Sequence, residues 1–172
     1  MSIKHGLLAL LSEGPRYGYE LRTAFEARTG GAWPLNVGQV YTTLGRLERD
    51  GLVTQQGTDD DGHVYYAIND AGRTELDQWF GQPVERTPPP RDELAIKIAL
   101  ASGLPGVDVA GVVQQQRTAT VSTLQQLTRQ KAKALAGGET GWLVVLDALV
   151  AAADADVRFL DTCDARLISR GA

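Results

Sequence analysis

A polar strip on one predicted helix is the part of this sequence best equipped for chemistry. The helix is predicted to run from Asn36 to Asp50. Its apolar residues recur at helical spacing and are expected in a core: Val37, Val40, Tyr41, Leu44 and Leu47. The opposite face carries amide, hydroxyl and guanidinium groups: Gln39, Thr42, Thr43, Arg46 and Arg49. In the major groove of DNA, glutamine can pair with adenine, arginine with guanine, and a threonine methyl can meet the methyl of thymine.

The sequence also marks the ends of this helix. Asn36 can cap the first backbone amides, and Gln39, three residues later, can reach back in a variant of the capping box. Gly51 suits the left-handed residue that follows a helix. Because base readout comes mainly from the N-terminal part of such a helix, we favour its first four polar residues over Arg49. A solvated helix face would show the same side chains, so the neighbouring elements must decide between the two interpretations.

The elements around this helix follow a defined order. Further helices are predicted at residues 3–11, 17–28 and 71–80, and short strands at residues 52–56 and 63–68. Tyr65 and Tyr66 point to opposite sides of the second strand, so one should be buried and the other is free to face DNA. Three short helices, a hairpin and a fourth helix predict a winged helix-turn-helix, a mostly α fold with a small β-hairpin wing.

A proline-rich break at residues 87–90 divides the chain, because proline lacks an amide donor and restrains the residue before it. We expect a winged helix-turn-helix, DNA-binding domain over residues 1–86 and a helical dimerisation and effector domain over residues 91–172. Helices are predicted in the second domain at residues 92–101, 109–135 and 140–168. The last carries a coiled-coil seam in which only Asp156 is out of character: Trp142, Leu146, Leu149, Ala153, Asp156, Leu160, Cys163 and Leu167. Stripes on two long helices predict a partner subunit.

Composition narrows the possible classes. The 172 residues are 43% hydrophobic and 22% charged, which excludes wholesale disorder. Seventeen basic and twenty-one acidic residues give a net charge of −4, so the chain is not a general polycation that coats nucleic acid. Its apolar runs are far shorter than the roughly 18 residues of a membrane span, and its N-terminus lacks the features of a signal peptide. The sequence therefore predicts a soluble, cytoplasmic protein.

The usual signatures of enzymes and metal sites are missing from the sequence. It has no phosphate-binding loop motif and no nucleophile-elbow motif. The aspartates at residues 59–61 resemble the start of a calcium loop but lack its downstream glutamate. Cys163, the only cysteine, is interpreted as a small buried hydrophobe, with a redox sensor as the alternative. We expect no catalytic residues, no metal and no cofactor.

Five segments occur in an order that is specific as a set. They are residues 5–11 (HGLLALL), 14–21 (GPRYGYEL), 37–53 (VGQVYTTLGRLERDGLV), 65–72 (YYAINDAG) and 91–100 (RDELAIKIAL). This set resembles the PadR family of bacterial transcriptional regulators over roughly residues 3–101. The resemblance implies a homodimeric winged-helix repressor that binds an inverted-repeat operator in double-stranded DNA and is released by a small ligand.

The resemblance also implies roles for individual residues. Residues 36–46, beginning with Asn36, would lie in the major groove, with the hairpin against the neighbouring minor groove or phosphates. Lys4, Tyr17 and Tyr41 are candidate phosphate contacts, although Tyr41 fits a core position equally well. Tyr65 is a further candidate from the wing.

Two departures from the family pattern affect this assignment. Thr42 stands where relatives commonly have a proline, which frees a backbone donor near the helix start. The wing tip carries aspartates at residues 59–61 where relatives often have basic residues. Because carboxylates repel phosphate, we expect this tip to swing clear of DNA. His63 is then the remaining wing contact, unless it is structural or merely exposed.

Ligand sensing and charge leave alternatives open. The resemblance implies a small hydrophobic or aromatic effector, which would stack on Trp142, Phe159 or Trp79, but these rings serve equally well as packing. Residues 16–56 hold five arginines and four carboxylates, a net charge of +1 that predicts modest affinity for DNA. This weak charge keeps open a winged-helix adaptor that binds proteins instead. A row of aspartates in the last helix is expected to face solvent: Asp147, Asp154 and Asp161.

Overall fold

The computed structural model describes residues 3–84 and 91–168. Contacts divide the chain into two compact units, Met1–Glu85 and Arg86–Ala172. Each unit has a hydrophobic cluster of its own. The proline-rich break predicted at residues 87–90 lies outside the described residues.

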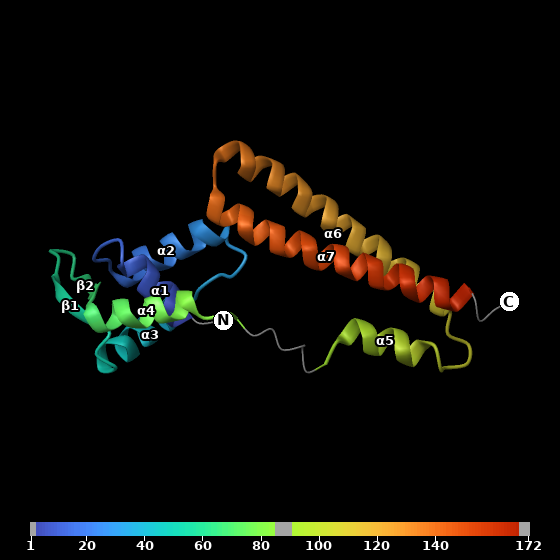
Figure 1. The fold of residues 1–172 in the computed structure, drawn as a ribbon, viewed down its shortest axis with the longest axis horizontal. Coiled ribbons are helices and arrows are strands. Elements are labelled where there is room, and N and C mark those ends of the chain that lie inside the picture. Colours follow the sequence, from blue (N-terminus) through green and yellow to red (C-terminus); the bar gives the residue numbers. More distant parts are fainter. Residues whose placement is uncertain (1–2, 85–90, 169–172) are drawn as a thin grey trace. The chain divides into compact units, whose positions relative to one another are not determined.

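The first unit contains short helices and one hairpin in the predicted order (Figure 1). Its elements are α1 (Ile3–Leu11), α2 (Gly18–Thr29), α3 (Val37–Arg49), β1 (Val53–Thr58), β2 (Val64–Ile68) and α4 (Asp70–Gly81). Each predicted element is present, and its ends differ from the prediction by at most two residues. The mostly helical fold with a β-hairpin wing is confirmed.

The leucines of α1 form the centre of the first unit's core, and the other elements pack around them. Leu7, Leu8 and Leu11 are at most 1% exposed. The buried face of α3 consists of three residues at helical spacing: Val40, Leu44 and Leu47. Two further residues predicted for this face are not in the core, because Tyr41 is 42% exposed and Val37 is only half-buried. Tyr41 lies about 100° around the helix from its buried neighbour and therefore points past the core.

The hairpin is antiparallel and is irregular near its tip. A bulge interrupts the register between Gln55 and Gly57. Arg16, just before α2, pairs with Tyr66 through two backbone hydrogen bonds of 3.1 and 3.0 Å, so the hairpin is joined to the helices on one edge. Tyr66 is buried and Tyr65 is half-buried, which confirms the predicted alternation.

The start of α4 is fixed to the turn that follows α3. The side chain of Asn69 accepts a hydrogen bond from Gly72 N at 2.9 Å and donates one to Gly51 O at 2.8 Å. Gly72 lies so close to the carbonyl oxygen of Leu52 that a β-carbon would collide with it. Position 72 therefore accommodates only glycine without a shift of the neighbouring backbone.

The last turn of α4 extends beyond the core. Leu76 is buried, and Trp79 is half-buried. Phe80 is 68% exposed. The Trp79 ring stacks on His5, and Phe80 lies beside that ring at a centroid distance of 4.9 Å, so tryptophan takes the inner place.

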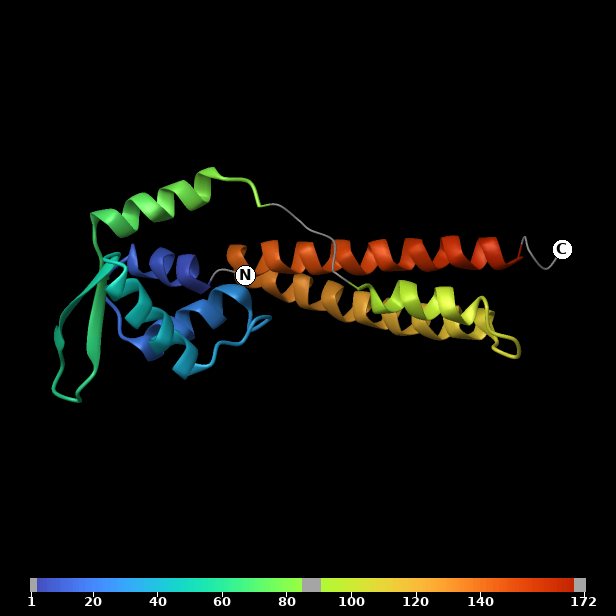
Figure 2. The same cartoon turned by 90° about the horizontal axis from the view of Figure 1, so that it is seen from below.

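The second unit is a long helical hairpin with one shorter helix. Its elements are α5 (Glu93–Ala101), α6 (Val109–Gly137) and α7 (Thr140–Ile168). α6 and α7 lie side by side along their length (Figures 1 and 2). Gly138, at a φ of 71°, ends α6 and allows the tight turn into α7. No helix among the described residues is long and apolar enough to cross a membrane.

The seam predicted on α7 is partly covered within the chain. Leu146 and Leu160 are fully buried and Ala153 is 8% exposed. Leu160 clusters with Val113 of α6 and Ile98 of α5. The other seam residues are only half-buried or, for Asp156, exposed. α6 therefore covers the stripe in part, and the predicted partner subunit stays a prediction. Cys163 was predicted to be buried, but it is only half-buried, and it packs against the cluster that contains Leu160.

Polar bridges flank the packed seam between α6 and α7. They include the ion pairs Arg117–Asp161 at 2.7 Å and Lys131–Asp147 at 2.5 Å and the hydrogen bond Gln114–Asp164 at 3.1 Å. Asp147 and Asp161 are exposed, as predicted, and each also pairs with a cation of α6. Asp154 pairs instead with Arg158 of its own helix. These bridges hold the two helices in one register.

Replacing Gly72 with alanine should destabilise the first unit. The new methyl would collide with Leu52 O and the side chain of Ile68, and overpacking of this kind costs roughly 1–3 kcal/mol. Equilibrium denaturant unfolding measures the loss. Gly81→Ala, in the same helix but with open space around the site, is the matched control and should be neutral or slightly stabilising. Equal stability of the two variants would contradict the close approach.

Candidate nucleic-acid interface

The polar strip of α3, defined as Gln39, Thr42, Thr43 and Arg46, lies on the surface of the first unit. Three of its members are exposed and Thr43 is half-buried. The buried face of α3 holds the opposite side of the helix in the core, so the strip must face outward. Arg49 is also exposed, one turn further on. The predicted division of α3 into two faces is confirmed for these residues.

Asn36 caps α3, but the rest of the predicted capping box is absent. Its Oδ1 atom accepts a hydrogen bond from Gly38 N at 2.8 Å. The side chain of Gln39 was predicted to reach back to the start of the helix, yet it makes no hydrogen bond with any described residue. It lies in the polar strip instead. Both ends of its amide therefore remain available to another molecule.

The two threonines of the strip use their hydroxyl hydrogens inside the helix. Thr42 donates to Gly38 O and Thr43 donates to Gln39 O, both at 2.8 Å. This is the back-bonding that threonine commonly makes to the carbonyl four residues earlier. The methyl groups have no such internal partner. The strip consequently offers one amide, one guanidinium and two methyl groups.

A shallow hollow of about 450 Å³ follows the strip between α1 and α3. Its lining includes the whole strip and four other residues: Ile3, Lys4, Leu47 and Asp50. Lys4 and Arg46 are its two cationic side chains, and Asp50 is its only carboxylate. The sequence pointed to Lys4 only through the family resemblance, and the structure places it beside the strip.

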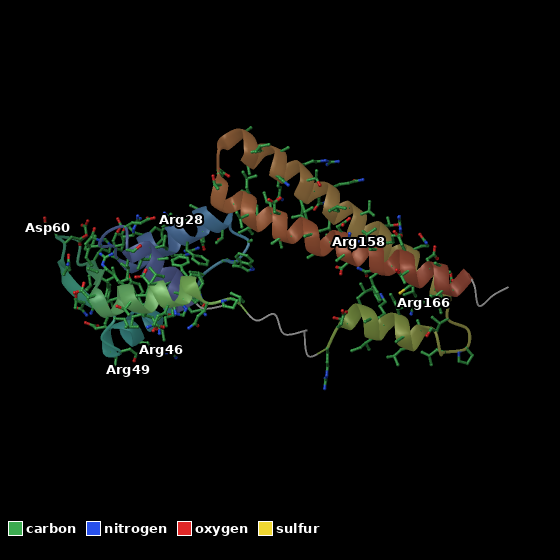
Figure 3. All side chains as sticks on the ribbon, viewed as in Figure 1. Arg28, Arg46, Arg49, Asp60, Arg158 and Arg166 are labelled. Atoms are coloured by element: carbon green, nitrogen blue, oxygen red, sulfur yellow. The ribbon has the colours of Figure 1, made fainter. Side chains whose placement is uncertain are left out.

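Arg46 differs from most cations of the first unit, which are held by carboxylates. The ion pairs are Lys4–Glu75, Arg16–Glu13, Arg28–Glu13, Arg22–Glu26 and Arg49–Asp50. Within residues 3–84, Arg46 and Arg73 make no ion pair. Figure 3 shows Arg46 and Arg49 extending from α3. Arg46 is therefore the strip's one positive charge, and no described carboxylate neutralises it.

Lys4 is tied to α4 by a shared carboxylate. Its Nζ lies 2.6 Å from Glu75 Oε1, and His5 Nε2 lies 3.0 Å from the same oxygen. The His5 ring stacks on Trp79 at a centroid distance of 5.1 Å and an interplanar angle of 5°. Hydrogen bonds from Lys4 and His5 lower the pKa of the Glu75 carboxyl, so it stays ionised around neutral pH.

The acidic wing tip is folded around one carboxylate. Asp59 Oδ1 accepts hydrogen bonds from the backbone amides of His63 at 2.8 Å and Asp61 at 3.1 Å, and Oδ2 lies 3.0 Å from His63 Nδ1. The hydrogen bond from the backbone amide of His63 is the main cause that lowers the pKa of the Asp59 carboxyl. Ligand atoms of Asp59, Asp61 and His63 lie within 4.8 Å of one another, but both oxygens of Asp59 already serve the loop. Asp60 projects from the tip (Figure 3).

Three predicted DNA contacts meet at the base of the wing, where Tyr17 contacts the other two. The Tyr17 ring stacks on His63 at a centroid distance of 4.4 Å and meets Tyr65 edge-on at 5.5 Å. Desolvation raises the pKa of the Tyr17 and Tyr65 phenols, and the carboxylates of Glu20 and Asp59 add to the shift. Both phenols are therefore neutral donors. We define these three rings as the wing clasp, because they join β2 to the start of α2.

Tyr41 lies outside the core and against the backbone of α2. A β-carbon at Gly18 would lie 2.6 Å from the Tyr41 ring, so glycine is the residue that permits this contact. Of the two interpretations of Tyr41, the core position is excluded by its exposure. The ring packs on one side while its other side stays accessible.

The three proposed effector rings do not form one site within a unit. Trp79, in the first unit, is stacked on His5. Trp142 is half-buried and Phe159 is 38% exposed, both on α7. They are seventeen residues apart, which at 1.5 Å per residue separates them by about 25 Å along the helix. One planar molecule cannot stack on both within a single chain.

Sequence reasoning missed two acidic residues that border the interface. Glu75 holds Lys4 from a helix that follows the hairpin, and Asp50 lines the hollow at the end of α3. Asp50 was taken only as the last residue of the predicted helix. No spacing rule could have connected Glu75 with Lys4, because the two are 71 residues apart.

Comparison with known proteins gives two family matches along the chain. Residues 7–78 match the model of the transcriptional regulator PadR-like family, and residues 90–167 match the model named virulence activator alpha C-term. A probable transcriptional regulator of Mycobacterium tuberculosis is 35% identical over 96 residues, which cover 53% of this chain and 50% of that protein. The match thus spans half the length of that relative.

The fold agrees with solved structures of a regulator from Bacillus subtilis. PadR in complex with operator DNA matches with a TM-score of 0.75 and 23% identity over 96% of this chain and 99% of that one. PadR in complex with p-coumaric acid matches with a TM-score of 0.77 and 22% identity over 95% and 97%. In sequence, the negative transcriptional regulator PadR of Bacillus subtilis is 30% identical over 132 residues, covering 72% of this chain and 71% of that protein. The winged-helix unit, its exposed polar strip and these matches show that the chain belongs to the PadR-like family of transcriptional regulators.

Proposed function

We propose that this chain is a homodimeric repressor that binds an inverted-repeat operator in double-stranded DNA, with α3 of each subunit in the major groove. The observation that carries the proposal is the polar strip. It is exposed along one side of α3, and its Arg46 has no internal carboxylate partner among residues 3–84. A protein-binding adaptor would not need an amide, two methyl groups and a free guanidinium aligned along a helix that fits a major groove.

Each group of the strip has a partner on the base edges. Gln39 would pair with adenine through its free amide, and Arg46 would bind guanine through two hydrogen bonds. Thr42 and Thr43 would contact thymine methyls, because their hydroxyl hydrogens already bind backbone carbonyls. The polar strip therefore favours a half-site that contains adenine, guanine and thymine at the contacted positions.

The phosphates on either side would be bound by groups that flank the strip. Lys4 of α1 and Tyr41 of α3 are the contacts that we propose beside the strip, and Asn36 lies at the start of α3. The wing clasp would add Tyr17, Tyr65 and His63. The two tyrosine hydroxyls can donate to phosphate oxygens without an ion pair. Few cations are free in this unit, so the affinity for random DNA should be modest and its salt dependence shallow.

The second unit would form the dimer. A single chain leaves large apolar side chains exposed there: Ile96, Leu100, Leu104, Leu135, Val144 and Phe159. Ile96 and Leu100 are 44% and 62% exposed and, four residues apart, lie on one face of α5. A dimer has to hold its two α3 helices about 34–36 Å apart to enter successive major grooves.

A small aromatic compound is the effector class that we propose for the switch. The solved complex of Bacillus subtilis PadR with p-coumaric acid supports an aromatic acid as a first compound to try. Trp142 or Phe159 would stack on it singly, since the two are far apart. A ligand that prefers a different spacing of the α3 helices would release DNA by its difference in affinity for the two states. A repressor of this kind would act in the cytoplasm, where it meets the chromosome.

Replacing Arg46 with alanine should weaken operator binding roughly 5- to 150-fold, because a bidentate arginine–guanine contact contributes about 1–3 kcal/mol of discrimination. The operator is first located by footprinting DNA upstream of the chain's own gene, and affinities are then measured by fluorescence anisotropy. Arg73→Ala removes an equally unpaired charge from α4 and is the matched control. Equal losses in the two variants would show that Arg46 contributes charge alone and would reject base reading.

Two substitutions of Thr42 can test its methyl group and its hydroxyl group separately. Thr42→Val keeps the methyl and should bind the operator as well as the native chain does. Thr42→Ser removes it and should lose about fourfold, since one buried methyl is worth roughly 0.8 kcal/mol. Uracil in place of the contacted thymine should produce the same loss with the native chain and none with Thr42→Ser. If Thr42→Val binds worse than Thr42→Ser, the hydroxyl reads the base and the methyl contact is wrong.

If the native protein is a dimer in solution, light scattering should give it a mass about twice the 18.5 kDa of one chain. Leu100→Glu should raise the dimer dissociation constant at least about tenfold, because the carboxylate would be buried without a partner. Lys97→Glu, on the same helix and also exposed, is the control and should leave the dimer intact. A monomeric native chain at micromolar concentration would contradict the proposed repressor.

A further inference from the structure

Lys4 stands at the rim of the interface but does not point freely into it. It lines the hollow beside the polar strip, while its Nζ lies 2.6 Å from Glu75 Oε1 of α4. The two side chains are 37% and 32% exposed, so solvent and any bound molecule can reach the pair. Of the hollow's two cationic side chains, one is therefore neutralised in the free protein and the other, Arg46, is not.

The position of Lys4 in α1 explains why a carboxylate is needed there. Lys4 is the second residue of the helix, where the helix dipole and unsatisfied amides disfavour a cation and favour an anion. Glu75 supplies that anion from another element. A DNA phosphate at the same place would satisfy both the helix end and the ammonium group. The carboxylate thus occupies a position that suits a phosphate.

Glu75 is itself held in place. Oε1 is bonded by His5 as well as by Lys4, and the His5 ring is stacked on Trp79. The carboxyl remains ionised, because both bonds favour its charged form. A fixed negative charge beside the interface repels an approaching backbone as well as binding the lysine.

We infer that Glu75 competes with a DNA phosphate for the ammonium of Lys4 and thereby limits the affinity of this chain for DNA. The inference rests on the proposed function, since it assumes that the polar strip binds DNA. The competition acts on the sugar–phosphate backbone, so it changes affinity for operator and random DNA alike. The polar strip determines which base sequence is bound, and Glu75 changes the affinity for every DNA sequence alike.

Glu75→Gln tests this competition directly. The amide keeps the size of the side chain and an acceptor for Lys4 but removes the charge. Affinity should rise about two- to fivefold for both operator and random DNA, as expected from the energy of one exposed ion pair. The salt dependence should steepen by up to about 0.9 in the log–log slope, which corresponds to one additional phosphate contact.

Two further variants separate competition from general charge. Asp77→Asn removes a carboxylate from the same helix that makes no ion pair with any described residue, and it should change affinity by less than Glu75→Gln. In the Lys4→Ala background, Glu75→Gln should have little effect, because the contested ammonium is gone. Denaturation midpoints of all variants check that the fold is kept. If Glu75→Gln does not fold, Glu75→Asp, which withdraws the carboxylate by one methylene, should tighten binding in the same direction.

The outcomes distinguish this inference from the proposed function. Equal gains from Asp77→Asn and Glu75→Gln, or an undiminished gain in the Lys4→Ala background, would overturn the competition. Weaker binding by Glu75→Gln would also overturn it and would make Glu75 a positioning residue for Lys4. If Arg46→Ala weakens operator binding while Glu75→Gln changes nothing, only the inference about Glu75 is wrong. Absence of DNA binding by the native chain would remove the proposed function itself.

Discussion

The rotation of α3 about its own axis is the constraint on which the rest of the first unit depends. Three apolar residues, each at most 1% exposed, hold one face of the helix against the leucines of α1. Once that face is buried, 3.6-residue periodicity leaves no choice about which side chains face outward. Asn36, through its bond to Gly38, sets where the helix begins. Packing therefore aims the polar strip, and the strip itself contributes little to the packing.

Most side chains of the first unit that carry a positive charge form ion pairs within the unit. Ion pairs connect α1 with α4 and the turn after α1 with α2, and a carboxylate organises the wing tip. This arrangement weakens the electrostatic attraction of the unit for a polyanion such as DNA, because few cations are left without a carboxylate partner. Shape and hydrogen-bond pattern must then supply most of the discrimination. A regulator built in this way gains selectivity by avoiding strong binding to DNA in general.

The sequence predicts what is local and fails where partners are distant. Helix ends followed from caps and glycines such as Asn36 and Gly51, and the two faces of α3 followed from spacing. The covering of α7 could not be assigned, since a periodic stripe shows that something must pack on it and not which element does. The wing clasp was missed for a related reason: Tyr17 is separated from His63 by α2, α3 and β1, and each ring alone resembled a DNA contact.

The bridges between α6 and α7 have a mechanical consequence. With Arg117 paired to Asp161 and Lys131 to Asp147, neither helix can slide by a turn without losing these bonds, so we expect the pair to behave as one stiff rod. Each helix has 29 residues and is therefore about 43 Å long at 1.5 Å per residue, and a tilt of about five degrees at one end displaces the other by roughly 4 Å. A lever of this length magnifies small rearrangements at its pivot into motions as large as a base-pair step.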